Sequence, residues 1–317
     1  MTETTKTIFE KYEIRKTKAQ KSAFITFVQA EAEKLGYSCR TEKGWLGARN
    51  IVVGDPETAK VVYTAHYDTC PVMPFPNFIT PRHLGIYLLY QIAMVMVFML
   101  VPMIAVMVLF QLAAAALEME PDLAVSISVM LGYGVMLAFL AMLLCGPANR
   151  HTANDNTSGV TVLLDIMQAL PENHREDTAF IFFDLEESGL FGSGGYYSRH
   201  KKTMKQKLLI NFDCVSDGEH ILLAVQKKAE KYIPVLQKAF VKDENVQVEI
   251  ISKGVFYPSD QMNFPCGVGA ASLKQWKKSG ILYMDRIHTA KDTVYREENI
   301  AYLTAASLRL AELFSEE

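Results

Sequence analysis

The chain contains two long apolar stretches that no charged residue interrupts. They run from 84 to 117 and from 123 to 149, and the acidic, proline-containing turn EMEPD separates them at 118–122. Each stretch exceeds the roughly 20 apolar residues that an α-helix needs to cross a bilayer. We therefore expect a transmembrane helical hairpin, with helices at about 84–110 and 123–146.

Polar residues within these stretches are isolated and do not build a polar face. They are Gln91, Gln111, Ser126 and Ser128. Because a helix in a soluble core usually keeps a polar face, the pattern favours a membrane hairpin over two buried core helices. Interfacial helices, or helices that form a homo-oligomer, are the alternatives. Pro102 should kink the first helix, and Gly132 and Gly134 would let the two helices approach closely.

Outside the hairpin, apolar stretches of strand length alternate with amphipathic stretches of helical length. Strands are expected at 50–55, 60–68, 178–189, 206–218, 246–252 and 281–293, and helices at 5–35, 154–170, 230–241 and 300–314. This alternation predicts an α/β domain with helices on both faces of its sheet. Residues 1–83 and 150–317 would form one split domain, interrupted by the hairpin at 84–149. Gly36 should end the first helix, and Thr157 or Ser158 should lie at the start of the second.

Charge and cysteine content exclude some classes of protein. The 317 residues carry a net charge of −3, with 32 basic and 35 acidic residues, and no basic patch indicates nucleic-acid binding. The five cysteines lack CxxC or CxxH spacing, which favours free thiols in a reducing compartment over a disulfide framework. The charged N-terminus has no apolar core of the kind found in signal peptides.

Basic residues flank the expected hairpin, and acidic residues occupy its turn. Arg82 and His83 precede the hairpin, and Arg150 and His151 follow it. The two apolar stretches predict a two-pass integral membrane protein. Because positively charged flanks tend to stay in the cytoplasm, both termini and the α/β domain would face the cytoplasm.

The stretch TAHYDT at 64–69 places a histidine and an aspartate at the end of an apolar strand. Alternate side chains of a strand point the same way, so His66 and Asp68 should emerge together. Taken alone, this pair fits a hydrogen-bonded turn, a base held by a carboxylate, or part of a metal site.

Acids or histidines also follow the other expected strands. The full set is His66, Asp68, Asp155, Glu186, Glu187, Asp213 and His288. Open α/β sheets place their sites at the carboxyl ends of the strands, and carboxylates gathered there repel one another unless cations neutralise them. Two histidines with several carboxylates suit zinc, and also cobalt or manganese. A carboxylate shared by two ions would indicate a two-metal hydrolase, although a cap, a turn or a solvated loop explains each residue singly.

Six motifs together resemble a known family. They are AHYDT, NDNTSGV, DLEESGLFGS, NFDCVSDG, SDQMNF and HTAKDT, in that order. The order resembles that of the di-zinc aminopeptidases related to glutamate carboxypeptidase, a family of zinc exopeptidases that also includes single-zinc glutaminyl cyclases. The resemblance covers about 45–83 and 150–317. It implies a three-layer α/β/α zinc-exopeptidase-like mixed sheet, with the hairpin as an insertion.

The resemblance also implies a set of metal ligands. His66 and Asp213 resemble ligands of a first metal ion, and Glu187 and His288 resemble ligands of a second. Asp155 resembles the carboxylate that bridges the two. The implied cofactors are two Zn²⁺ ions, with Co²⁺ or Mn²⁺ as alternatives.

Two further residues resemble parts of the catalytic machinery. Glu186 resembles the general base, and Asp68 resembles the carboxylate that orients the imidazole of His66. The chain departs from some aminopeptidases of the family just before the final histidine, where it has Ile287 in place of a tyrosine that steadies the oxyanion. Tyr257 and Arg286 are the candidate replacements.

The resemblance implies a membrane-anchored, metal-dependent aminopeptidase. Two zinc ions would activate a water, Glu186 would take its proton, and the substrates would be peptides with a free amino terminus. Because the hairpin is inserted between two site motifs, we expect apolar peptides, some of them from the bilayer surface. The alternatives are a single-zinc glutaminyl cyclase or amidohydrolase, and a non-catalytic membrane scaffold. Every implied ligand position is filled, which favours an enzyme.

Overall fold

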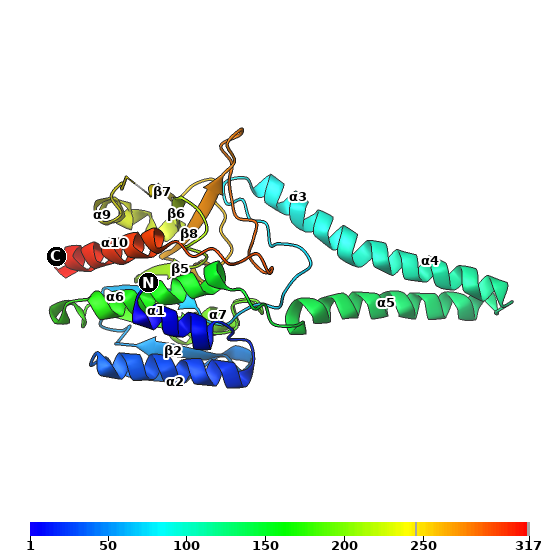
Figure 1. Cartoon of the computed structure of the whole chain (residues 1–317), viewed down its shortest axis with the longest axis horizontal. Helices are drawn as coiled ribbons and strands as arrows, with labels where there is room; N and C mark the ends of the chain where they lie inside the picture. The colour runs from blue at the N-terminus through cyan, green and yellow to red at the C-terminus, as the bar shows by residue number, and fades with distance from the viewer. Residues whose placement is uncertain (245, 316–317) are drawn as a thin grey trace. The chain divides into compact units, whose positions relative to one another are not determined.

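The computed structural model describes residues 1–244 and 246–315 and divides into two compact units. The first joins Met1–His83 to the chain from Ala148 onward, and the second is Leu84–Pro147. Figure 1 shows the first unit as a sheet with helices packed on it and the second as a helical hairpin.

A nine-stranded mixed sheet forms the centre of the first unit. The strand order is β1-β2-β4-β3-β5-β8-β6-β7, and β9 pairs with β8. The strands are β1 Cys39–Lys43, β2 Arg49–Val53, β3 Val61–His66, β4 Thr178–Phe183, β5 Leu208–Phe212, β6 His220–Val225, β7 Gln247–Ile251, β8 Gly267–Gln275 and β9 Leu282–Tyr283. The neighbours from β4 to β8 are parallel, whereas β1, β2 and β6 join their neighbours β2, β4 and β8 antiparallel.

The central strands are buried on both faces. Every residue of β3, β4 and β5 is buried, which explains their nearly continuous apolar sequences VVYTAH, TAFIFF and LLINF. Along β3, Val61 and Tyr63 face a large core cluster, while Val62 faces a second, smaller cluster. The expected α/β fold with a mixed sheet is confirmed.

Helices cover the two faces of the sheet. The helices of this unit are α1 Glu3–Thr7, α2 Lys18–Lys34, α6 Gly159–Ala169, α7 Phe191–Arg199, α8 Lys201–Met204, α9 Ile233–Ala239 and α10 Glu297–Ser315. Buried residues of α2, α6, α9 and α10 belong to the large cluster. Tyr196 of α7 and Met204 of α8 belong to the smaller one.

The helix expected over 5–35 is two segments. A helical turn ends at Tyr12, and α2 begins after Thr17, whose side chain accepts a hydrogen bond from the N–H of Gln20 in a complete capping box. This cap starts a new helix where periodicity alone suggested a continuous one. Gly36 ends α2 as expected, in the left-handed region with φ of +79°.

Several elements differ from the expected ones. The expected strand over 281–293 is only Leu282–Tyr283, because the chain then forms the loop that carries His288. Strands β1, β6 and β8 and helix α7 had not been expected. Ser158 lies at the start of α6 as expected, directly before Gly159, but its side chain does not cap the helix; the N–H of Gly159 donates to Oδ1 of Asn156 instead.

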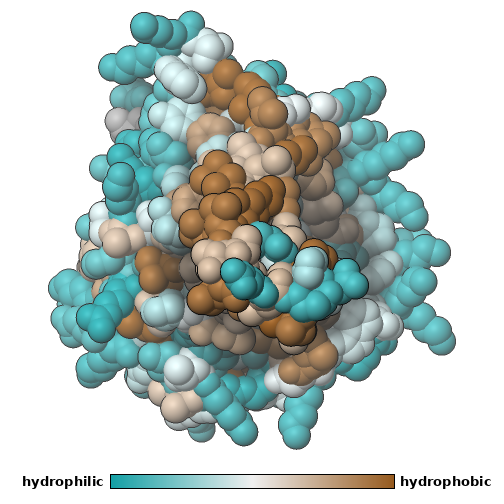
Figure 2. All heavy atoms as spheres, turned by 90° about the vertical axis from the view of Figure 1, so that its right-hand side faces the viewer, coloured by the Kyte–Doolittle hydropathy of each residue, from teal (hydrophilic) through white to brown (hydrophobic). Residues whose placement is uncertain are grey.

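The second unit is a pair of apolar helical segments. The first runs through α3 Leu84–Val95, a π-helical turn at Met96–Leu100 and α4 Val101–Ala116, and the second is α5 Pro121–Cys145. Both segments are long and apolar enough to cross a membrane, by length and composition. Figure 2 shows hydrophobic side chains gathered together, with a largely hydrophilic surface around them.

Small residues on α5 pack against α4. Gly132 lies against Met103 and Met107, where an added Cβ would approach Met107 to 2.8 Å. Gln111 donates a hydrogen bond to Ser128 at 2.9 Å across the two helices. A Cβ added to Gly134 would meet no atom of the described residues within 4 Å, so only Gly132 serves the close approach. Near Pro102 the helix is widened by the π-helical turn rather than broken.

Candidate metal centre

The site residues lie beyond the carboxyl ends of the parallel strands. His66 is the last residue of β3, and Asp213 directly follows β5. Glu186 and Glu187 lie just after β4. Because parallel strands direct these ends to one edge of the sheet, residues from distant parts of the chain meet there.

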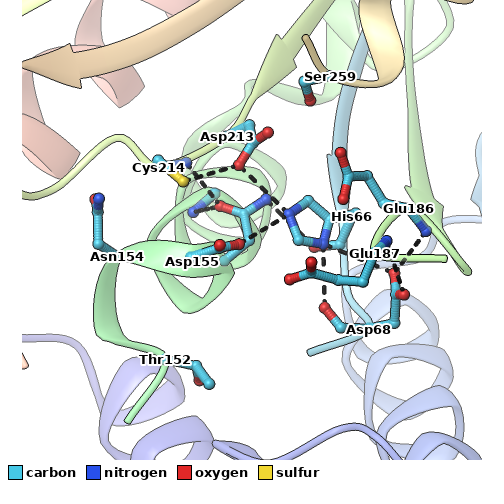
Figure 3. Close-up of polar contacts among 12 residues, drawn as sticks. His66, Asp68, Thr152, Asn154, Asp155, Glu186, Glu187, Asp213, Cys214 and Ser259 are labelled. Atoms are coloured by element: carbon cyan, nitrogen blue, oxygen red, sulfur yellow. Dashed lines mark hydrogen bonds and ion pairs between the residues drawn. The ribbon is translucent and has the colours of Figure 1, made fainter. Parts of the chain in front are cut away.

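His66 and two carboxylates form a first group of possible ligand atoms. Its Nε2 lies 3.2 Å from Oδ1 of Asp155 and 3.3 Å from Oδ1 of Asp213. Figure 3 shows both aspartates directed at the imidazole. The three ligand atoms lie within 4.8 Å of one another, close enough to surround one ion.

His288 forms a second group with the other oxygen of Asp155. Its Nε2 lies 3.0 Å from Oδ2 of Asp155 and 3.2 Å from Oε2 of Glu187. One oxygen of Asp155 therefore belongs to each group. This is the arrangement that a carboxylate shared by two ions requires.

Asp68 connects the histidine to the loop after β4. Its carboxylate accepts hydrogen bonds from the backbone N–H groups of Glu186 at 3.1 Å and Glu187 at 3.3 Å. The Nδ1 of His66 is nearer to the backbone oxygen of Asp68, at 3.1 Å, than to its carboxylate, at 3.7 Å. A hydrogen on Nδ1 can be donated to either oxygen, which leaves Nε2 free as the ligand atom.

Two asparagines beside Asp155 hold the ends of the strands. The Nδ2 of Asn156 donates to the carbonyl of Phe212 at 3.0 Å and to that of His66 at 3.3 Å. Oδ1 of Asn154 accepts from the N–H groups of Ser216 and Asp217 at 2.7 and 2.9 Å. The NDN sequence thus positions the loops that carry the other donors.

Asp292 holds the Asp155 loop from the opposite side. Its Oδ1 accepts from the N–H of Asn154 at 2.8 Å, and its Oδ2 accepts from the N–H of Asp155 at 3.0 Å. Burial raises the pKa of Asp292 to about 7, and the charge of Asp155 adds to the rise. Asp292 lies in the HTAKDT motif, but sequence reasoning gave it no role.

The site holds more negative charge than its own residues neutralise. Burial raises the pKa of Glu187 to about 8, and it raises that of Glu186 well above its usual range. Burial alone would lower the pKa of His66, yet the nearby carboxylates of Glu186 and Asp213 raise it well above its ordinary value. Burial likewise opposes ionisation of Asp155, but contacts with His288 and His66 lower its pKa.

The donor set fits a metal ion. Oε1 of Glu187 is buried and has no hydrogen-bond partner among the described residues. The carboxylates and imidazoles of the two groups are the ligands that zinc takes in proteins. A cation would satisfy this oxygen and offset the burial, and the smaller repulsion from neighbouring carboxylates, that raise the pKa values of Glu186 and Glu187.

The candidate oxyanion residues differ in position. Tyr257 is 4% exposed, and its hydroxyl donates to the backbone oxygen of Asp213 at 3.0 Å, so it reaches the site. Arg286 instead pairs with Asp217 at 3.2 Å. Sequence reasoning also overlooked Asp260, whose buried carboxylate oxygens have no hydrogen-bond partner among the residues described. Burial raises the pKa of Asp260 to about 7.

Comparison with known families decides the assignment. The model of peptidase family M28 matches residues 138–311, which is more than half of the chain. The chain belongs to peptidase family M28. The expected resemblance to this family is thus confirmed. A search by sequence among curated proteins finds no match.

Solved structures share the fold of this M28 chain. The LapA aminopeptidase of Legionella pneumophila aligns with a TM-score of 0.57 at 14% identity, over 99% of this chain and 68% of that one. Porphyromonas gingivalis glutaminyl cyclase aligns with a TM-score of 0.57 at 15% identity, over 99% and 98%. A Zn-dependent exopeptidase from Parabacteroides distasonis aligns with a TM-score of 0.52 at 14% identity, over 99% and 98%.

Proposed function

We propose that this M28 chain is a membrane-anchored aminopeptidase that uses two zinc ions. Membership of family M28 supports a metal-dependent peptidase or a related activity. The shared position of Asp155 carries the proposal of two ions, because its oxygens lie 3.2 Å from Nε2 of His66 and 3.0 Å from Nε2 of His288. Two ions would use both oxygens of Asp155, whereas a single ion would need only one of them.

Each ligand residue has a proposed place. His66 and Asp213 would hold one ion, Glu187 and His288 the other, and Asp155 both. Zinc supplies a Lewis acid that polarises a carbonyl and makes water more acidic. Co²⁺ or Mn²⁺ would also suit these donors.

Glu186 is the proposed general base. One of its carboxylate oxygens lies within 4.8 Å of a ring nitrogen of His66 and of a carboxylate oxygen of Glu187, so Glu186 faces both donor groups. The hydrogen bonds from its own N–H and that of Glu187 to Asp68 hold it there. Glu186 would take a proton from the attacking water and deliver it to the departing amine. Tyr257 is the proposed oxyanion donor in place of the tyrosine absent at Ile287, and its single O–H would have to turn from the backbone oxygen of Asp213 to the oxyanion.

The hairpin is proposed to anchor the enzyme and to bring it near its substrates. Its two segments have the length and apolar composition of membrane spans, and in sequence they separate His66 from Asp155. The substrates would be apolar peptides with a free amino terminus, some of them bound at the bilayer surface. Equal cleavage of soluble and membrane-associated forms of one peptide would count against this preference.

The first test measures metal content and peptide cleavage together. Detergent-purified wild type and Glu186→Gln are each assayed with matched free and N-acetylated peptides. We expect about two metal ions in both proteins, cleavage of the free peptides only, and a roughly 10²–10⁴-fold lower kcat for the variant. Glu172→Gln is the control, because this substitution makes the same chemical change at a side chain that is 89% exposed and belongs to neither donor group.

The opposite results have specific meanings. One ion and no cleavage of any peptide, but cyclisation of an N-terminal glutamine, would support the second candidate function, a glutaminyl cyclase. The fold likeness to the Porphyromonas gingivalis cyclase over 98% of that chain favours this second candidate. Absence of both metal and turnover in wild type would leave a non-catalytic scaffold.

A further inference from the structure

One cysteine lies inside the candidate metal centre, and the proposed function does not use it. The Sγ of Cys70 is within 4.8 Å of ligand atoms of Asp155, Glu187 and His288. Cys70 is 1% exposed and sits in the loop that leaves β3, four residues after His66. Its sulfur therefore belongs to the second donor group by position.

The backbone holds Cys70 beside His288. The N–H of Met73 donates to the carbonyl of His288 at 2.7 Å, which joins the two loops. The N–H of Asn149 donates to the carbonyl of Cys70 at 3.1 Å, and its side-chain amide donates to the carbonyl of Thr289 at 3.0 Å. These hydrogen bonds hold the backbone of the Cys70 loop beside that of the His288 loop.

The second donor group also has an acceptor that lacks a partner. Oε1 of Glu187 makes no hydrogen bond to any described residue, and the side chain is 8% exposed. Its other oxygen contacts Nε2 of His288 at 3.2 Å. A buried carboxylate oxygen without a partner is costly unless something positively charged occupies the space beside it.

We propose that Cys70 is a thiolate ligand of the ion held by Asp155, Glu187 and His288. The inference rests on the proposed function, because it assigns a fourth protein donor to one of the two ions. On binding, the thiol proton passes to solvent and the sulfur electron pair goes to the ion, so charge and atoms balance.

The distances and the chemistry of the donors agree with this assignment. Zn–S and Zn–N distances of about 2.3 and 2.0 Å keep tetrahedral ligand atoms roughly 3–4 Å apart. The four donor atoms all lie within 4.8 Å of one another, which is compatible with that range. A soft sulfur donor beside an imidazole favours zinc or cobalt over manganese or magnesium. Cys70 would therefore select the metal at the second position.

Cobalt substitution tests the assignment without relying on activity. The detergent-purified full chain is stripped of metal, loaded with two equivalents of Co²⁺, and examined for a sulfur-to-cobalt charge-transfer band in the near ultraviolet. We expect the band in wild type and its loss in Cys70→Ser. Affinity for one of the two zinc equivalents should fall by roughly tenfold or more in this variant.

Two other cysteines serve as matched controls. Cys214 is buried next to the first donor group, where its thiol donates to Oδ1 of Asp213 at 3.1 Å. The thiol of Cys266 contacts only backbone carbonyls among the described residues, and none of them belongs to a donor group. Cys214→Ser and Cys266→Ser should both keep the band. Equal thermal unfolding of the metal-free forms of wild type and Cys70→Ser would show that the substitution leaves the fold intact.

The outcomes separate this inference from the proposed function. If wild type binds two cobalt ions and cleaves peptides but shows no band, Cys70 is only a packing residue and the function stands. A band that persists in Cys70→Ser contradicts the assignment equally. If wild type binds no cobalt, or if His288→Ala leaves both affinities unchanged, the proposed metal centre itself is wrong.

Discussion

At the scale of single residues, the site consists of candidate ligands and of residues that hold them. Asn154, Asn156 and Asp292 do not face an ion, yet they satisfy backbone groups of the loops that carry the donors. A ligand's affinity depends on such support, because each loop would otherwise have to be ordered when the metal binds. Both carboxylate oxygens of Asp292 accept a hydrogen bond from the Asp155 loop.

Replacement of Asp292 by alanine should weaken metal binding without removing a ligand. It would leave the buried N–H groups of Asn154 and Asp155 without acceptors, at a cost of about 1–3 kcal/mol each to the free energy of unfolding. We expect metal affinity to fall roughly 10–100-fold, measured by competition with a chelating dye. Asp292→Asn, which keeps one acceptor, should be intermediate. Wild-type affinity in Asp292→Ala would refute the supporting role.

At the scale of elements, the N-terminal helix α2 is tied to the end of β4. Lys21 of α2 forms an ion pair with Asp184, and the two side chains are 9% and 3% exposed. Asp184 also accepts hydrogen bonds from the N–H groups of Arg49 and Leu185. Because Glu186 follows two residues later, the ion pair fixes the helix and the start of the loop that carries Glu186 together.

Breaking this ion pair on one side should be strongly destabilising. Lys21→Met leaves the carboxylate of Asp184 buried and uncompensated, and we expect a loss of about 3–5 kcal/mol in the free energy of unfolding. Lys21→Met combined with Asp184→Asn removes both charges and should recover most of the loss. Urea unfolding followed by circular dichroism measures both variants. If the double variant is less stable than Lys21→Met alone, the cost does not come from an unpaired buried charge.

At the scale of the whole molecule, the α/β unit is complete without the hairpin. All nine strands of the sheet come from residues before His83 or after Ala148. Pro71 and Ala148 are paired as an isolated bridge within this unit, so the chain on either side of the insertion is held together. The hairpin has its own helix pairing through residues such as Gly132.

Removal of the hairpin should therefore leave a folded, metal-binding protein. A variant in which a short Gly/Ser linker replaces Leu84–Pro147 should stay in solution without detergent, whereas the full chain should require it. Native-like circular dichroism and metal content near that of the full chain would support independent folding. A deletion variant that aggregates even when refolded with zinc would contradict it.

The orientation of the hairpin can be tested with the full chain in intact cells. Single cysteines introduced into the turn Glu118–Asp122, in a background lacking the native ones, should react with an impermeant reagent added outside intact cells. Cysteines near either terminus should be protected, because the basic flanks are expected in the cytoplasm. The reverse labelling pattern would place the α/β unit outside the cytoplasm.

The local sequence decided the α/β class and the two apolar segments, whereas the mixed sheet was implied only by the family resemblance. Strands such as VVYTAH carry these signals within a few residues, because burial on both faces demands continuous apolar sequence. The candidate donors could also be named, since His66, Asp155 and Asp213 sit in short motifs at strand ends. The break before α2 was missed although its capping box of Thr17 and Gln20 is a local signal. The short β9 was misjudged because the extent of a strand depends on partners that are distant in the sequence.

Only the tertiary structure decided which atoms meet. Residues 66, 155, 213 and 288 are far apart in the chain, and their convergence depends on strand order, which no local pattern encodes. For the same reason the sequence could not show that Asp155 directs one oxygen to each histidine, or that the thiol of Cys70 lies among the donors. Periodicity reports how a segment is buried, whereas a metal centre depends on long-range contacts that exist only once the sheet has formed.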